Sequence, residues 1–195
     1  MPCAMMHLMC AKEFDYDAHI GFYIGNIAPD CIDIREFKDK NHLRIYNADE
    51  RLKKLRELAD SLRLDDPYQF GVLLHLYTDM SWDLGPMAEH KSNYKGDDWF
   101  SDYRQEIRYI SKFMYKHISW AEKLWEDMKN ADTDIYSSVL YYPVENIKGY
   151  IEHNVTVHKL PHAIESAAFP NSLVFEFCKK TVDEFKKWLN EEDLI

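Results

Sequence analysis

Helix-forming patterns run through almost the whole chain and restrict its fold more than any other feature. Residues 47–64 place leucines at spacings of three and four with charged residues between them, which is typical of a surface helix with a narrow apolar stripe. A second helix is predicted from Pro67, with Asp66 as its cap, to about Trp82. Further helices are predicted over residues 99–129, with a bend near His117, from Pro143 to about His158, and over residues 171–190.

Signals for β-strands are nearly absent. A short strand is a candidate only over residues 21–28, and residues 87–97 are predicted to form a loop. The chain has only six glycines, and no linker rich in Gly, Ser or Pro interrupts it. We therefore expect one all-α domain, a multi-helix bundle that spans residues 1–195.

The charge of the chain limits its partners. Lys and Arg number 24 and Asp and Glu number 34, which gives a net charge of −10. Such a surface repels nucleic acids and anionic lipids at long range, so we expect no nucleic-acid partner. No apolar run approaches the roughly 20 residues of a membrane-spanning helix, and MPCAMMHLMCAKEF is a poor signal peptide. We expect a cytoplasmic protein without a membrane span, whose oligomeric state the sequence leaves open.

The cysteine pattern agrees with that compartment. The four cysteines are Cys3, Cys10, Cys31 and Cys178. They show no CxxC spacing, and three of them crowd the first 31 residues. This is not the framework of a disulfide-rich domain, so we expect free thiols in a reducing compartment.

The segment LLHLYTDMSWD (73–83) combines an apolar core pattern with three polar residues four positions apart. On a helix His75 and Asp79 project from one face in adjacent turns, and Asp83 continues the row. A buried aspartate is costly unless it is paired or bound to a metal. One interpretation is a hydrogen bond between His75 and Asp79 at a half-buried seam. The other is a pair of ligands for one cation.

Three residues elsewhere in the sequence favour the metal interpretation. His7 lies in an apolar N-terminal helix, Asp30 ends the hydrophobic run GNIAPD at a turn, and His42 follows twelve residues later. Imidazole and carboxylate ligands together suit Zn²⁺ or another divalent ion such as iron or manganese. Because no thiolate is required, the set fits a catalytic site better than a structural site rich in cysteine.

The order of these residues resembles that of a known family, the zinc-dependent phospholipase C and single-strand-specific nuclease superfamily, in particular its small bacterial members of unassigned substrate. The resemblance is carried by MHLMCA (6–11), GNIAPD (25–30), the lone His42 and GVLLHLYTDMSWD (71–83), and it covers about the first 85 residues. Beyond them only helical character and aromatic content are similar. The resemblance implies an all-α bundle that holds a zinc cluster.

The resemblance also implies roles for individual residues. Asp30, His42, His75 and Asp79 would hold one metal ion, and His7 would join a second, with Asp79 as the bridge. Secreted members of the family use an N-terminal Trp amine as a ligand and carry a later His…His-x3-Glu set for a further zinc. This chain begins MPCAMMHL, and we cannot place the later set in it. Asp83 could replace part of that set, and two metal ions are expected rather than three.

Five other histidines are interpreted mainly as surface or helix-end residues, with ligation as the alternative. They are His90, His117, His153, His158 and His162.

The expected function is metal-dependent hydrolysis of a small phosphoester, with phospholipid, nucleotide and other phosphoesters all open as substrates. Two or three divalent ions would activate water, and Asp79 and Asp83 are the candidate catalytic residues, with Asp83 orienting the water or accepting its proton. One alternative is a metal phosphohydrolase of the HD type, although this chain has no adjacent His-Asp pair. The other is a non-catalytic helical module that binds metal at a degenerate site or serves as an interaction module.

Overall fold

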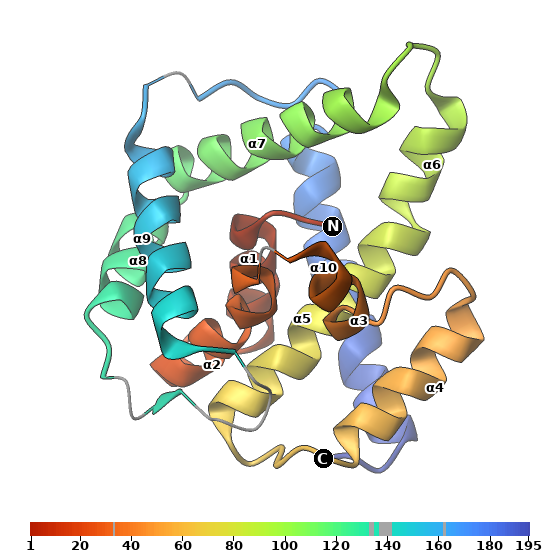
Figure 1. Ribbon diagram of the computed structural model, residues 1–195, viewed down its shortest axis with the longest axis vertical. Coiled ribbons are helices and arrows are strands. Elements are labelled where there is room, and N and C mark those ends of the chain that lie inside the picture. Colours follow the sequence, from red (N-terminus) through yellow and green to blue (C-terminus); the bar gives the residue numbers. More distant parts are fainter. Residues whose placement is uncertain (33, 133–134, 137–141, 162) are drawn as a thin grey trace.

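The computed structural model describes the chain except for residues 33, 133–134, 137–141 and 162 (Figure 1). In the described part the regular elements are all helices, which confirms the predicted all-α bundle. They are α1 (Ala4–Phe14), α2 (Ile20–Gly25), the 3₁₀ turn η1 (Ala28–Cys31), α3 (Arg35–Asn41), α4 (Ala48–Ala59), α5 (Pro67–Leu84), α6 (Pro86–Asn93), α7 (Trp99–His117), α8 (Ala121–Lys129), α9 (Val144–Lys159) and α10 (Asn171–Glu191).

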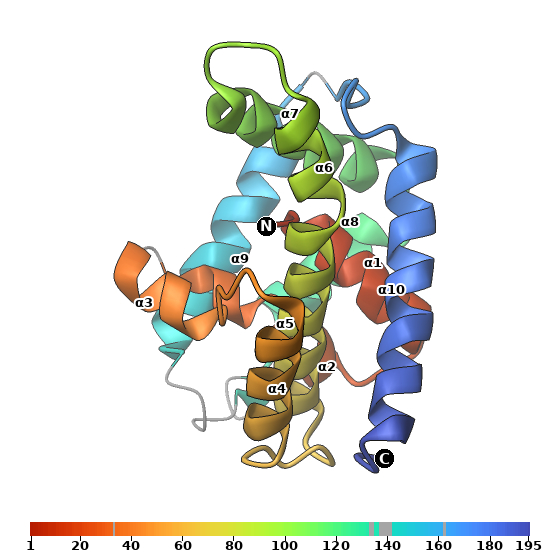
Figure 2. The same ribbon diagram turned by 90° about the vertical axis from the view of Figure 1, so that its right-hand side faces the viewer.

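Helix α5 forms the centre of the bundle. It contacts α1, α2, α4, α6 and α10 (Figures 1 and 2). Nearly all of its residues are buried, including the polar ones. Its start is the predicted one, because the Asp66 side chain accepts hydrogen bonds from the backbone N–H groups of Tyr68 and Gln69. A helix that is covered on all sides must satisfy any polar side chain that it carries inside the protein.

Two predicted elements differ from the structure. Residues 21–28 form α2 and the start of η1 rather than a strand, and the backbone N–H of Asn26 donates to the Phe22 carbonyl at 2.9 Å. A lone strand would have left those backbone groups without partners. Residues 87–97 were expected to be a loop, but residues 86–93 form α6, which Pro86 opens at a position where no backbone N–H is needed. The predicted bend near His117 is confirmed, since α7 ends there and α8 begins at Ala121.

The crossing of α2 and α5 depends on two glycines. A Cβ atom at Gly25 would lie 1.9 Å from the Tyr68 carbonyl oxygen, and one at Gly71 would lie 2.1 Å from the Phe22 carbonyl oxygen. The Asn26 side chain also donates from Nδ2 to the Gly71 carbonyl at 3.2 Å. The two backbones are therefore in direct contact, which fixes Asn26 against the middle of α5.

Replacing Gly71 by alanine tests this crossing. The added methyl group must push α2 away from α5, so Gly71→Ala should lower the free energy of unfolding by about 3 kcal/mol. Gly149→Ala is the matched control, because a Cβ there meets nothing within 4 Å on the exposed face of α9. The control should raise stability by about 0.5–1 kcal/mol, as expected of Gly→Ala inside a helix. Equal behaviour of the two variants in chemical denaturation would contradict the close crossing.

His158 is a buried histidine that packs inside the layer formed by α7, α8 and α9. Its ring stacks on Tyr115 with a centroid distance of 4.8 Å, and its Nε2 lies 2.8 Å from the Ser111 hydroxyl. Burial lowers the pKa of His158 to about 4. The neutral imidazole is therefore the form that the folded protein keeps.

This packing predicts a pH dependence of stability. The folded pKa of His158 lies below the unfolded value near 6.5, so its contribution is present above pH 6.5 and is lost as the pH falls toward 4. Between pH 7 and pH 5 the free energy of unfolding of the unmodified protein should fall about 2 kcal/mol more than that of His158→Phe. Denaturant titrations in the presence of a chelator measure this difference. Parallel losses in both proteins would show that His158 titrates as if exposed.

Candidate metal centre

Five of the predicted ligand residues meet in one cluster inside the bundle. His7 comes from α1, Asp30 from η1, His42 from the residue that caps α3, and His75 and Asp79 from α5. The residues are almost completely buried: the exposed fraction of the whole residue is 0% for His7, His42, His75 and Asp79 and 6% for Asp30. Residues far apart in the sequence thus bring three imidazoles and two carboxylates into one buried site.

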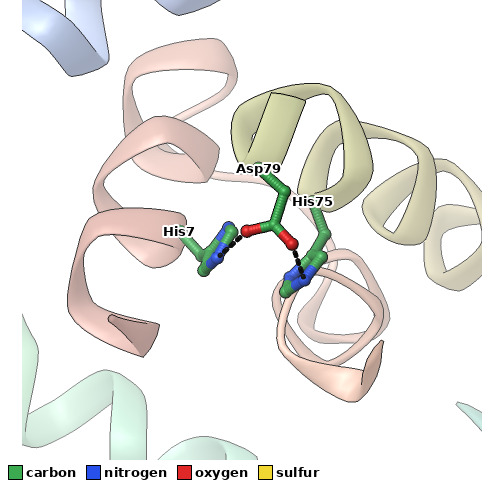
Figure 3. A group of neighbouring side chains, drawn as sticks. All are labelled: His7, His75 and Asp79. Carbon is green, nitrogen blue, oxygen red and sulfur yellow. Dashed lines mark ion pairs between the residues drawn. The ribbon is translucent and has the colours of Figure 1, made fainter. Parts of the chain in front are cut away.

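The Asp79 carboxylate lies at the middle of the cluster. Its Oδ1 is 3.4 Å from His7 Nε2, and its Oδ2 is 3.7 Å from His75 Nε2 (Figure 3). The same Oδ2 is 3.7 Å from His42 Nε2, which in turn is 3.4 Å from Asp30 Oδ1. Each oxygen of Asp79 therefore faces a different set of imidazoles.

These separations match the spacing of ligands around a cation. Zinc bonds of about 2.1 Å in a tetrahedral arrangement place neighbouring ligand atoms about 3.4 Å apart. Ordinary N–H···O hydrogen bonds between the same atoms would be roughly 2.7–3.2 Å long. Potential ligand atoms lie within 4.8 Å of one another in two groups, His7/His75/Asp79 and Asp30/His42/His75. The two buried triads could therefore each hold a metal ion.

Backbone contacts fix the orientation of two imidazoles. His75 Nδ1 lies 2.8 Å from the Asn26 carbonyl and His42 Nδ1 lies 2.7 Å from the Lys38 carbonyl, so each Nδ1 carries a proton and donates it. In a neutral imidazole the other nitrogen, Nε2, then bears a lone pair. Both lone pairs point toward carboxylate oxygens, which are also acceptors. Acceptors that face acceptors need added positive charge between them, from a proton or from a metal ion.

Most of the polar atoms that face one another in the cluster lack hydrogen-bond partners in the described part of the chain. They are His7 Nδ1 and Nε2, His42 Nε2, His75 Nε2 and both oxygens of Asp79. Asp30 Oδ1, in contrast, forms an ion pair with Lys38 Nζ at 3.0 Å. The His7 ring stacks on His75 at a centroid distance of 3.8 Å, an arrangement that two charged imidazoles would oppose. A buried polar group without a partner costs about 1–3 kcal/mol, so this cluster is expensive unless something else satisfies it.

Electrostatics keep the cluster close to the protonation state that binds metal. Burial, with a smaller effect of His7, lowers the pKa of His75 to about 3, so this imidazole is neutral at pH 7. Burial alone would raise the pKa of Asp79, but His75, His7 and His42 hold it below its ordinary value. Burial likewise opposes the shift of His42, whose pKa Asp30 and Asp79 nevertheless raise. Without metal a proton on His42 would supply positive charge, and an incoming metal ion would displace that proton.

Asp83 lies one turn beyond Asp79 but belongs to neither triad. Its Oδ2 is 3.1 Å from a terminal nitrogen of the buried Arg51, and its Oδ1 is 3.1 Å from the amine of Met1. Arg51 also donates to the His42 carbonyl at 3.2 Å. Arg51 thus links Asp83 to the backbone of His42. No spacing in the sequence indicated this link.

The other histidines considered in the sequence belong to neither triad where the structure describes them. His90 packs between aromatic rings next to Phe169, His117 is exposed with Nδ1 donating to the Phe113 carbonyl, and His153 is exposed. His158 has the buried packing described above, and His162 lies outside the described residues. All four cysteines are thiols outside any disulfide bond, as predicted; they are also buried, and none belongs to either triad.

Sequence reasoning missed three residues around the cluster. Asn26 and Lys38 act through backbone carbonyls, which leave no trace in residue type, and Arg51 looked like an ordinary charge on a surface helix. Only the position of Lys38, one turn before His42, could have indicated that its carbonyl contacts the His42 ring.

Comparisons with protein-family models, with curated proteins and with solved structures found no match. Among the described helices, none is both long and apolar enough to cross a membrane. What can be said of the centre therefore comes from its own geometry.

Replacing Asp79 by asparagine separates a metal centre from a hydrogen-bonded seam. The amide keeps the shape and can donate to a histidine Nε2, so Asp79→Asn should be at least as stable as the unmodified protein in chelator. Zinc at about 100 times its Kd should stabilise the unmodified protein by about 2.7 kcal/mol and the variant far less. Thermal and chemical unfolding with and without zinc measure both effects.

Asp127→Asn is the matched control, since Asp127 is exposed and pairs with Lys123 on the surface. It should respond to zinc like the unmodified protein. A large loss of stability for Asp79→Asn in chelator, with no zinc effect on either protein, would identify the cluster as a seam held by protons.

Proposed function

We propose that this chain is a metal-dependent hydrolase of phosphoesters whose buried centre holds two divalent ions. The observation that supports this most is that the Nε2 atoms of three histidines face carboxylate oxygens of Asp30 and Asp79 at 3.4–3.7 Å, and that these nitrogens and both Asp79 oxygens have no hydrogen-bond partner among the described residues. The order of the same residues in the sequence, which resembles that of the zinc-dependent phospholipase C and nuclease superfamily, supports it independently.

The two triads share His75, and this determines how two ions would be divided. The single lone pair on His75 Nε2 serves one ion only. Asp79, in contrast, directs Oδ2 toward His42 and His75 and Oδ1 toward His7. We therefore assign Asp30, His42, His75 and Asp79 Oδ2 to one ion. His7 and Asp79 Oδ1 would hold the other.

The second ion would have few protein ligands, which is the property of a catalytic metal site. The donor atoms are nitrogen and oxygen without sulfur, so zinc is the favoured metal, and iron or manganese would also fit. Burial raises the pKa of the nearby Cys3 thiol to about 11, which keeps it protonated and a poor ligand.

Bound divalent ions would supply a nucleophilic water near neutral pH and neutralise charge on the phosphoester oxygens. Asp79 would act as the residue that fixes the two ions relative to each other. Asp83 is held by Arg51, which also contacts the His42 carbonyl, so we propose that Asp83 positions His42 rather than ligating metal. The backbone carbonyls of Asn26 and Lys38 would keep His75 and His42 in the tautomer that leaves Nε2 free.

A second candidate function is a metal-binding helical module without catalysis. The observation that favours it is burial, because four of the five cluster residues are fully inaccessible and a substrate needs access. Opening of the bundle near the cluster is therefore part of the hydrolase proposal.

Hydrolysis of bis(4-nitrophenyl) phosphate and of 4-nitrophenyl phosphate distinguishes the two candidates. The zinc-loaded protein should release nitrophenol from at least one of them, and chelator should abolish the reaction. His7→Gln removes the only imidazole assigned to the second ion, so the rate should fall at least about 100-fold while the helical content stays the same.

His117→Gln is the control for that variant, because His117 is exposed on α7. It should keep the full rate. A protein that holds zinc tightly but hydrolyses neither compound would instead be the non-catalytic module.

A further inference from the structure

Lys38 contacts two of the proposed ligands from outside the cluster. Its Nζ lies 3.0 Å from Asp30 Oδ1, and its backbone carbonyl accepts the Nδ1 proton of His42 at 2.7 Å. Asp30 Oδ1 is the same atom that faces His42 Nε2 at 3.4 Å. The ammonium therefore stands beside a carboxylate oxygen that we assign to a metal ion.

Lys38 also lies between the cluster and solvent. Its side chain is 22% exposed, whereas that of Asp30 is 7% exposed and those of His42 and Asp79 are at most 1% exposed. Helix α3, which carries Lys38, projects from the side of the molecule opposite α10 (Figure 2). The partly exposed Lys38 therefore lies on the side of the cluster where Asp30 is closest to solvent.

The charge of Lys38 has opposite effects with and without metal. Without metal, the ammonium lies 3.0 Å from Asp30 Oδ1 and offsets the negative charge of that buried carboxylate. A divalent ion that takes Asp30 as a ligand would repel the ammonium at the same place. The flexible four-carbon stem of lysine lets the ammonium turn toward solvent while the backbone carbonyl stays on His42.

An anionic substrate would be attracted by such a cation. The chain carries a net charge of −10, which repels phosphoesters at long range. A lysine ammonium displaced to the outer edge of the centre would offset that repulsion where the substrate enters.

We propose that Lys38 is the resident counter-ion of the metal-free centre and the anion-recruiting residue of the loaded one. The inference rests on the proposed metal centre. It adds the class of ligand that Lys38 would favour, an oxyanion such as a phosphoester. Lys38 would thus determine specificity for charge without being a metal ligand.

Lys38→Met tests both halves of the proposal with zinc and inorganic phosphate as probes. Competition with a coloured chelator should show zinc binding about tenfold tighter in the variant, as Coulomb's law in water gives for a lysine charge roughly 6 Å from a divalent ion. Calorimetry on the zinc-loaded proteins should show phosphate binding about tenfold weaker, the loss expected for one charge-assisted hydrogen bond.

Two further variants make the test specific. Lys40→Met removes an exposed cation from the same helix and should change neither affinity. Lys38→Arg keeps the charge and should retain phosphate binding. Unchanged zinc affinity or unchanged phosphate affinity in Lys38→Met would overturn the inference and leave the metal centre standing. Failure of the unmodified protein to bind zinc would overturn both.

Discussion

The buried carboxylate of Asp79 is the constraint on which the centre of this bundle depends. It lies on a helix that is covered on all sides, with one oxygen facing His7 and the other facing His42 and His75. Because backbone carbonyls take the Nδ1 protons of His42 and His75, the nitrogens that face the carboxylate carry lone pairs. Only added positive charge, from a proton or from a metal ion, makes this arrangement favourable.

The rest of the fold serves to keep these groups in place. The close crossing of α2 and α5 at Gly25 and Gly71 brings the Asn26 carbonyl to His75. The buried pair of Arg51 and Asp83 ties α4 and α5 to the His42 carbonyl. Removing one partner of a buried ion pair leaves an uncompensated charge and costs about 3–5 kcal/mol, so Arg51 and Asp83 depend on each other in keeping the His42 carbonyl in place.

Much of the centre could be predicted from sequence because its residue types break a local pattern. His75 and Asp79 stand at helical spacing in an apolar segment, where neither belongs unless paired. The all-α fold followed from periodicity in the same way. His7, Asp30 and His42 share no local pattern with them; their residue types suggested one ligand set, and the resemblance to a zinc-dependent family supplied its division between two ions.

Other features could not be predicted because they depend on contacts between distant segments. The role of Asp83 depends on Arg51, which lies on another helix 32 positions earlier, and spacing along α5 alone suggested a ligand. Residues 21–28 looked like a strand because their apolar character does not distinguish a short strand from a short buried helix. The two glycines that allow α2 to touch α5 became meaningful only once both helices were placed.

The burial of the centre shapes what it can do. A sealed cluster strengthens every electrostatic interaction within it and excludes water, which suits both tight metal binding and chemistry on a phosphoester. The same burial means that the proposed ions and substrate would need a route to the centre, and we place its start at the partly exposed Lys38 beside Asp30.

The most direct test of this account is elemental analysis of protein purified without chelator or affinity tag, with zinc, iron and manganese counted per chain. The account predicts two ions bound per chain, either as purified or after incubation with zinc. No bound ion after incubation with each of the three metals would contradict it, and the histidines and carboxylates would then be a cluster held together by protons.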